Sequence, residues 1–465
     1  MNEKVAQALS HVDEKYVAQA ARRKKRHYTL KAAVAAVLVL AFLFHIPTLP
    51  LAVTAKAVSI APESRKADRP RPGTEEFRAW YDEQELRRHV AEAAAPTVAV
   101  FAENCSGTIL AGTDSVNRLW SPINAYIALA VTAELAGGST RDEVLSILGK
   151  DSLETLRMDV SDMWETIYSD DGREISVLAN SLWLDKDVGY VQQTTDDIAY
   201  HYYASVYQGD LGSRRTNRAM TNWLNNQTGG MLKDRTGSLS VDPESLLALA
   251  STVYFQAQWH DQFDSADNTE DAFHAADGDI TCTYMNAEEY HANYYWAEDY
   301  GAVQLFLKNG AMMWLILPDE DKTTDDVLRG GDYMNMITRS VAFPEENHKY
   351  MNVNLSLPKF DVSASTDLED GLKNAGLTNI FEPLGNDFSP SIISDVPVYL
   401  DSINQDTRVT IDEEGVTAAS YVLLQLGAGA AAPPDDTIDF VLDRPFLFAI
   451  TSSNIPLFTG VVNRP

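Results

Sequence analysis

Apolar side chains recur at helical spacing in four segments of the chain. The first predicted helix begins after Ser121, because the proline that follows suits a first helical turn, and it ends at a Gly-Gly pair. In the second, Thr140 and Glu143 form a capping-box pattern. The four segments are 117–138, 139–149, 216–234 and 368–377.

Other segments have the pattern of β-strands. Residues 246–259 are mostly apolar and rich in β-branched and aromatic side chains, which predicts a strand buried on both faces. Val353, Leu355 and Leu357 alternate with polar residues and would share one face of a strand. Helices come first and strands dominate later, which predicts an α+β domain with large sheets. The other predicted strands lie at 175–185, 312–318 and, as a pair, within 444–462.

The N-terminal part of the chain divides by composition. Residues 1–27 carry seven Lys/Arg and three acids, and residues 28–53 contain an apolar stretch near the ~20 residues that span a bilayer. The positive-inside rule predicts a basic cytoplasmic segment, 1–27, and a transmembrane signal anchor, 28–53. Residues 54–95 are charged and contain prolines, so they predict a juxtamembrane spacer before a compact domain at 96–465.

A cleaved signal peptide is the alternative. Residues 55–57, "AKA", fit the small-x-small cleavage pattern, so cleavage near Ala57 would give a secreted protein. The 27 residues before the apolar stretch are long for a signal peptide and favour the anchor. Both interpretations place the domain outside the cell, and a cytoplasmic head with an anchor indicates a bacterial surface protein.

Composition excludes several classes of partner. The chain has 465 residues and a net charge of −30, so duplex nucleic acid is not expected to bind, because phosphate contacts require a surplus of lysine and arginine. Cys105 and Cys282 can form at most one bridge, and no Cys/His cluster with metal-ligand spacing is present. HExxH, GxSxG, Walker A and GxGxxG motifs are all missing. We expect no metal, no cofactor and no enzymatic activity.

A segment near the C-terminus is unusual for a surface loop. Residues 411–420 read "IDEEGVTAAS", in which two acids and a glycine lead into small side chains, and residues 421–436 read "YVLLQLGAGAAAPPDD". A plain surface loop would be more polar, and a buried strand would not end in Gly, Ala and Pro. The composition suits a segment that is a loop in one state and a strand in another.

Seven segments carry a resemblance to a known family. They are "NRLWSPINAYIALAVTAELAGGSTRDEVLSILG", "NWLNNQTGGML", "LASTVYFQAQWHDQF", "MMWLILPDE", "LSLPKFDVSASTDLEDGLKNAGLTNIFEPLGNDFS", "VTIDEEGVTAAS" and "DRPFLFAITSSNIPLFTGVVNRP". In this order they make residues 96–465 similar to the serpin family. The resemblance implies a serpin fold with three β-sheets, about nine helices and an exposed reactive-centre loop.

The resemblance also implies a mechanism. In serpins a target protease cuts the exposed loop, and the part before the cut inserts as a strand into the main sheet with the acyl-enzyme attached. A hinge that threads between packed strands needs small inward side chains. Tyr421 is bulky where the family often has a small residue, which favours a substrate-like loop. The hinge residues implied are Glu413, Glu414, Gly415, Val416, Thr417, Ala418, Ala419 and Ser420.

The position of the cut bond depends on the reference point. Counting fourteen residues forward from Gly415, the usual family spacing, places the bond between Gly429 and Ala430, whereas counting back from residues 438–440 places it nearer Ala431 or Ala432. Every candidate is small, which suits a protease of the elastase type with a shallow specificity pocket, or a subtilisin-like one.

The family places a polar cluster beneath the loop that controls sheet opening. The corresponding residues here are Ser121, Asn124, Ser251 and Gln405, and Trp259 matches a family tryptophan at the top of the main sheet. The expected function is inhibition of serine proteases as a suicide substrate, through a covalent complex, by a monomer without a cofactor. The alternative is a non-inhibitory serpin that acts in binding or adhesion and is cleaved as a plain substrate.

Overall fold

The computed structural model separates two units, Met1–Val53 and Thr54–Pro465, and every described residue belongs to the second. The predicted cytoplasmic segment and anchor therefore lie outside the described residues. No helix in the described part of the chain is both long and apolar enough to cross a membrane. The described residues are 55–62, 70–112, 114–170, 175–231, 241–339, 344–400, 403–416 and 436–465.

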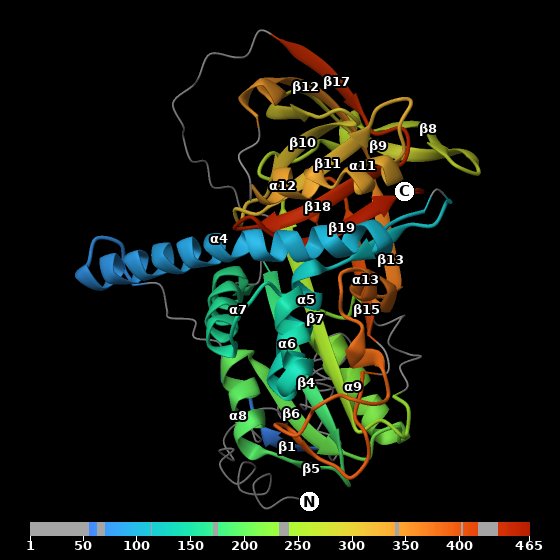
Figure 1. The fold of residues 1–465 in the computed structure, drawn as a ribbon. Helices are drawn as coiled ribbons and strands as arrows, with labels where there is room; N and C mark the ends of the chain where they lie inside the picture. The colour runs from blue at the N-terminus through green and yellow to red at the C-terminus, as the bar shows by residue number, and fades with distance from the viewer. Residues whose placement is uncertain are drawn as a thin grey trace, which may run out of the picture. The chain divides into compact units, whose positions relative to one another are not determined.

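An eight-stranded sheet forms one half of this unit (Figure 1). The predicted strands at 175–185 and 246–259 are confirmed as neighbouring central strands, antiparallel to each other. The strands in spatial order are β1 (Lys56–Ser59), β6 (Ala204–Gly209), β4 (Ile175–Asp185), β7 (Leu247–Gln258), β16 (Gly415–Val416), β15 (Asn404–Ile411) and β13 (Phe360–Asp367), with β3 (Ser169–Asp170) beside β4.

A nine-stranded sheet forms the second half, and a two-stranded sheet joins β5 (Gly189–Tyr190) to β14 (Ile392–Ile393). Val353, Leu355 and Leu357 are buried, as their alternation predicts. The order in the large sheet is β17 (Thr437–Val441), β12 (His348–Pro358), β9 (Gly278–Trp296), β10 (Tyr300–Phe306), β11 (Met312–Pro318), β18 (Phe446–Ser452), β19 (Ile455–Val462) and β2 (Arg118–Trp120), with β8 (Thr269–Ala275) beside β9.

Nine α-helices lie in the described residues, so the predicted α+β fold with three sheets and about nine helices is confirmed. The central helix α5 is buried along nearly its whole length and contacts β7 and β19. The helices are α4 (Glu75–Ile109), α5 (Pro122–Leu135), α6 (Gly138–Ile147), α7 (Leu153–Ile167), α8 (Gln192–His201), α9 (Arg214–Gln227), α11 (Thr324–Gly330), α12 (Asp332–Thr338) and α13 (Glu369–Asn374), with 3₁₀ turns η1 (Ser265–Asp267), η2 (Glu345–Asn347) and η3 (Asn379–Phe381).

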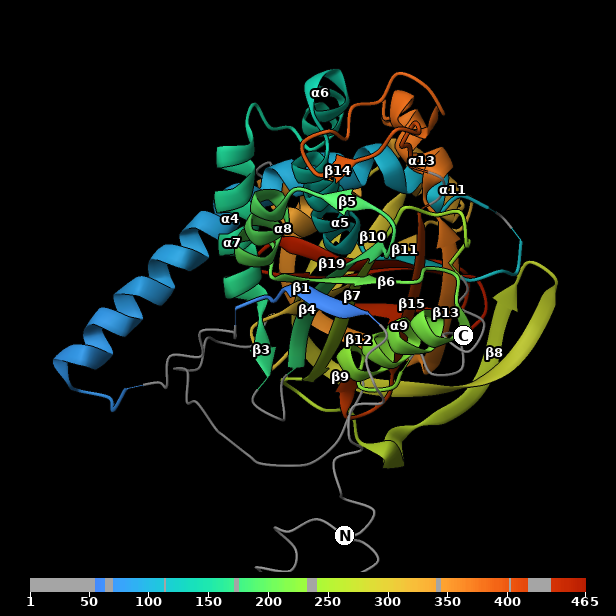
Figure 2. The ribbon, with the colours of Figure 1, turned by 90° about the horizontal axis from the view of Figure 1, so that it is seen from below.

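The compact unit begins earlier in the chain than residue 96, at Thr54. Residue 96 lies inside helix α4, whose first half extends beyond the neighbouring helix α7 in both views (Figures 1 and 2). Strand β1, inside the predicted spacer, pairs with β6 from Lys56↔Gln208 onward, and Ala55 is fully buried. A four-residue strand and a mostly polar half-helix have little hydrophobic pattern, so the sequence did not separate them from a spacer.

The predicted capping box in the second helix is wrong. Helix α6 begins at Gly138 after Gly137, without a side-chain cap. The Glu143 carboxylate instead accepts hydrogen bonds from the backbone N–H groups of Thr378 and Asn379, each at 2.9 Å. Glu143 therefore makes a tertiary contact instead of capping the start of its own helix.

Candidate functional site

The predicted hinge begins with a tight turn at the end of β15. Strand β15 ends at Ile411, and the backbone of Asp412 exchanges hydrogen bonds with that of Gly415 at 3.1 and 3.2 Å. The Asp412 carboxylate also accepts from the backbone N–H groups of Glu414 (2.9 Å) and Gly415 (3.2 Å). These bonds reverse the chain, so the residues after Glu414 run back along the sheet.

The residues after this turn already occupy the sheet as strand β16. Val416 pairs with Ile411 of β15 and with Ala257 of β7, and Gly415 pairs with Gln258. Val416 is buried, as expected for an inward hinge position. Across the described part of the sheet, β16 is the strand that connects β7 to β15. Thr417, Ala418, Ala419 and Ser420, and the candidate bonds at 429–432, lie outside the described residues.

Gly415 lies where a side chain would not fit. Its φ is +152°, in the region that favours glycine. A Cβ atom there would come within 2.3 Å of the carbonyl oxygen of Ala257 and 2.7 Å of Cα of Gln258. These are backbone atoms of a central strand and cannot move aside cheaply, so glycine permits the close contact between hinge and sheet.

Trp259 is hydrogen-bonded to the chain reversal that begins the hinge. It is buried, its backbone N–H donates to the carbonyl of Glu414 at 3.0 Å, and its indole Nε1–H donates to the carbonyl of Asp412 at 2.8 Å. The tryptophan expected at the top of the main sheet is therefore in direct contact with the chain reversal that precedes β16.

Glu413 adds an ionic contact that the sequence did not predict. Its carboxylate pairs with Lys359 and accepts a hydrogen bond from Asn268 at 2.5 Å. Burial raises the pKa of Glu413, but the bonds from Lys359 and Asn268 together lower it by more than burial raises it. The pKa therefore lies below its ordinary value of 4.5. The folded state therefore favours the ionised carboxylate.

This contact predicts an acid-sensitive hinge. The stabilisation is complete above about pH 4.5 and is lost as the pH falls through the lowered pKa of the folded state. Replacing Glu413→Gln should therefore lower the thermal midpoint by more at pH 7 than at about pH 3, which lies below the ordinary pKa of 4.5, so that protonation is already removing the stabilisation. Differential scanning fluorimetry measures both values, and Glu414→Gln, at an exposed neighbour, is the matched control. An equal loss at both pH values would contradict the assignment.

Two of the four predicted network residues, Ser121 at the start of helix α5 and Gln405 on β15, bind each other. Gln405, on β15, accepts from the backbone N–H of Ser121 at 2.6 Å and donates to its carbonyl at 3.1 Å. The Ser121 hydroxyl donates to the carbonyl of Leu457 at 2.5 Å. The start of helix α5 is thereby attached to β15.

The other two, Asn124 on α5 and Ser251 on β7, form a second group. The Ser251 hydroxyl donates to the side-chain oxygen of Asn124, and the Asn124 amide donates to the carbonyl of Ser251 at 3.2 Å. Asn180 on β4, which the sequence did not single out, lies 2.5 Å from the same hydroxyl. A 3.4 Å contact between the Asn124 backbone N–H and the Ser121 hydroxyl joins the two groups. The start of α5 therefore contacts both strands that flank β16.

Replacing Asn124→Leu should destabilise the protein by about 1–3 kcal/mol, because the Ser251 carbonyl loses the Asn124 amide and the Ser251 hydroxyl keeps only Asn180. Urea unfolding measures the change. Asn374→Leu is the control, because that amide bonds to Thr108 at an exposed position. An Asn124→Leu unfolding midpoint equal to that of the wild type would show that these hydrogen bonds do not hold the sheet closed.

Comparisons with known proteins agree with this geometry. The family described as Serpin (serine protease inhibitor) matches residues 97–465. Serpin-Z1C of Triticum aestivum is 27% identical over 392 residues, covering 78% of this chain and 94% of the relative. A serine proteinase inhibitor of Cavia porcellus is 25% identical over 380 residues, covering 79% and 88%. The native structure of Tengpin, a thermophilic serpin, has a TM-score of 0.69 at 26% identity and covers 89% of this chain and 100% of that one.

The chain belongs to the serpin family, whose members are generally serine protease inhibitors. The family and its relatives are described by proteinase inhibition rather than by a catalysed reaction. Missing catalytic motifs alone did not identify this activity. Within the described residues no group of three or more His, Cys, Asp or Glu is placed to hold a metal ion.

Proposed function

We propose that this chain inhibits serine proteases as a suicide substrate. The observation that supports the proposal most is β16, in which Gly415 and Val416 already pair with both β7 and β15. A cut further along the loop would free the following residues to continue this strand. Insertion would then carry the acyl-enzyme along and distort its active site.

The proposed targets are elastase-like or subtilisin-like proteases. Gly429, Ala430, Ala431 and Ala432 offer small side chains at every candidate bond, and a shallow specificity pocket accepts small side chains. A trypsin-like enzyme would need a basic residue, and the first one after the hinge is Arg444 in the connection between β17 and β18.

A non-inhibitory serpin, used for binding or adhesion, is the second candidate. Tyr421 favours it, because a bulky side chain at an early hinge position slows threading between packed strands. The loop is also two or three residues longer than is usual in the family.

We further propose that the protein is a membrane-anchored monomer on a bacterial surface, with residues 28–53 as the anchor. The buried Ala55 and the Lys56↔Gln208 pair support a retained N-terminus. Cleavage after Ala57 would remove Ala55 and the first two residues of strand β1.

The test is to mix the full chain, in a zwitterionic detergent, with an elastase and record intact masses. We expect a species at the sum of the two masses minus the C-terminal peptide, whose N-terminal residue identifies the cut bond. Complete cleavage with fully active elastase would reject inhibition of this class of enzyme and favour the plain-substrate alternative. A subtilisin reaction run in parallel separates the two proposed target types.

A further inference from the structure

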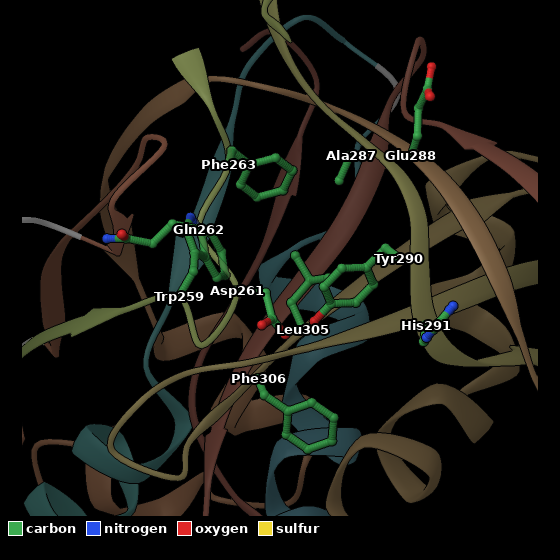
Figure 3. Close-up of a pocket in the computed structure, with 10 residues that line it drawn as sticks. All are labelled: Trp259, Asp261, Gln262, Phe263, Ala287, Glu288, Tyr290, His291, Leu305 and Phe306. Carbon is green, nitrogen blue, oxygen red and sulfur yellow. The ribbon is translucent and has the colours of Figure 1, made fainter. Parts of the chain in front are cut away.

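A pocket of about 370 Å³ lies against the residue that holds the hinge (Figure 3). Three separate segments build it: the connection after β7, the middle of β9 and the end of β10. Its size falls in the range of small-molecule sites. The lining residues are Trp259, Asp261, Gln262, Phe263, Ala287, Glu288, Tyr290, His291, Leu305 and Phe306.

The inner walls of the pocket are aromatic and apolar. Figure 3 shows Phe263 and Ala287 on one side and Tyr290 with Leu305 facing them. Phe306 at the rim is 43% exposed, which is unusual for a phenylalanine at the end of a buried strand. Aromatic faces of this kind bind flat apolar groups and, through their negative quadrupole, cations.

The charged groups in the pocket are carboxylates. Asp261 places its carboxylate beside Tyr290 and Leu305, and Glu288 lies at the rim (Figure 3). No lysine or arginine lines the pocket, and nearby Lys308 donates instead to the Gln258 side chain at 3.0 Å. Among the ion pairs of the described residues, Asp261 contacts only the exposed imidazole of His260, at 3.1 Å. Burial and the charge of Asp261 raise the pKa of Tyr290 to about 12, so its phenol stays neutral.

We propose that this pocket binds a small organic ammonium ion that carries one aromatic ring. The ring would stack between Phe263 and Tyr290, and the ammonium would face Asp261. Anions are disfavoured by the two acids, and an ammonium gains an attraction to the exposed Asp261 carboxylate that a purely apolar ligand lacks.

Occupancy of the pocket would also restrain the hinge, and this step rests on the proposed inhibitory function. Trp259 forms one wall, and Phe263 packs edge-to-face on it with ring centroids 5.9 Å apart. The same Trp259 donates to the carbonyls of Asp412 and Glu414. A ligand that fixes Trp259 and Phe263 in their present positions would favour the state in which the chain reversal before β16 is intact.

The experiment uses the full chain in zwitterionic nanodiscs and benzylammonium as the probe, with binding followed by saturation-transfer NMR. We expect a dissociation constant of about 1 mM for so small a ligand. Benzyl alcohol, the neutral analogue, should bind at least about tenfold more weakly, and Asp261→Asn should weaken benzylammonium binding by a similar factor.

Asp279→Asn is the matched control, because Asp279 is also an exposed carboxylate beside a histidine, His274, at 2.8 Å. It should bind benzylammonium as the wild type does. Equal affinities for Asp261→Asn and the wild type, or equal affinities for the amine and the alcohol, would overturn the proposed site. So would no signal at about 10 mM probe, ten times the expected dissociation constant.

The relation to the hinge has its own measurement. Insertion that continues β16 beyond Val416 leaves the reversal before Gly415 in place, so the loop-cleaved and intact proteins should bind benzylammonium with affinities within about twofold of each other. Binding lost on cleavage would overturn the contact between the pocket and a hinge that stays in the sheet. Because binding to the intact chain requires no protease, a protein that proves to be a plain substrate still tests the pocket, so the two failures are distinguishable.

Discussion

Cutting the loop between Val416 and Thr437 should raise the apparent thermal midpoint by about 10 °C or more, equivalent to about 8 kcal/mol for a unit of this size. The reason is that β16, with only two residues, lies between the longer strands β7 and β15. Val416 pairs with β7 on one side and β15 on the other, and a cut would let the residues after it extend both ladders. Scanning calorimetry of intact and cleaved protein at one scan rate measures the difference.

A charged hinge provides the control for this prediction. In Val416→Glu, a carboxylate would have to enter a position that is 2% exposed, so the cleaved variant should show no rise. If wild-type and variant midpoints rise equally on cleavage, the gain does not come from insertion between β7 and β15. If neither rises, the native state is not metastable in the proposed sense.

The second large effect is expected from Gly415→Ala. The added Cβ cannot lie 2.3 Å from the Ala257 oxygen, so Gly415 and Val416 should leave the sheet. A strained φ and a backbone clash cost about 1–3 kcal/mol, which reduces the fraction of molecules with Gly415 and Val416 in the sheet about fivefold or more. On reaction with a protease that cuts the loop, we expect cleaved protein to replace most of the covalent complex, as measured by denaturing gel densitometry.

Gly310→Ala separates backbone strain from the clash. Gly310 also has a positive φ, +83°, but a Cβ there would meet no atom within 4 Å. This variant should lose a comparable amount of stability from strain while forming the complex as the wild type does. A Gly415→Ala protein that still forms full complex would show that the close contact at Ala257 is not needed for insertion.

Patterns within one element were predictable from the sequence. The start of α5 follows from Ser121 and the proline after it, and the Ser121 hydroxyl does cap the helix by accepting from the backbone of Asn124. The strands at 175–185 and 312–318 follow from apolar runs of the right length. These features depend on a residue and its close neighbours, which the sequence displays directly.

Features that depend on distant partners were not predictable in this way. Asn180 is one polar residue inside an apolar strand, and nothing local shows that it faces Ser251. Glu143 bonds to residues more than 230 positions away, and Lys359 reaches Glu413 from the other side of the hinge. The network residues Ser121, Asn124, Ser251 and Gln405 were found through the family resemblance, and their positions fit it.

The edge strand β1 and the hinge lie at opposite ends of strand β7. Lys56 pairs with Gln208, beside the Leu184↔Leu247 end of β4 and β7, whereas Gly415 pairs with Gln258 at the other end of β7. The twelve residues of β7 separate these ends by about 36 Å. A strand that continues β16 would therefore run from the Gln258 end of β7 toward the Leu247 end, the end at which β1 pairs with β6.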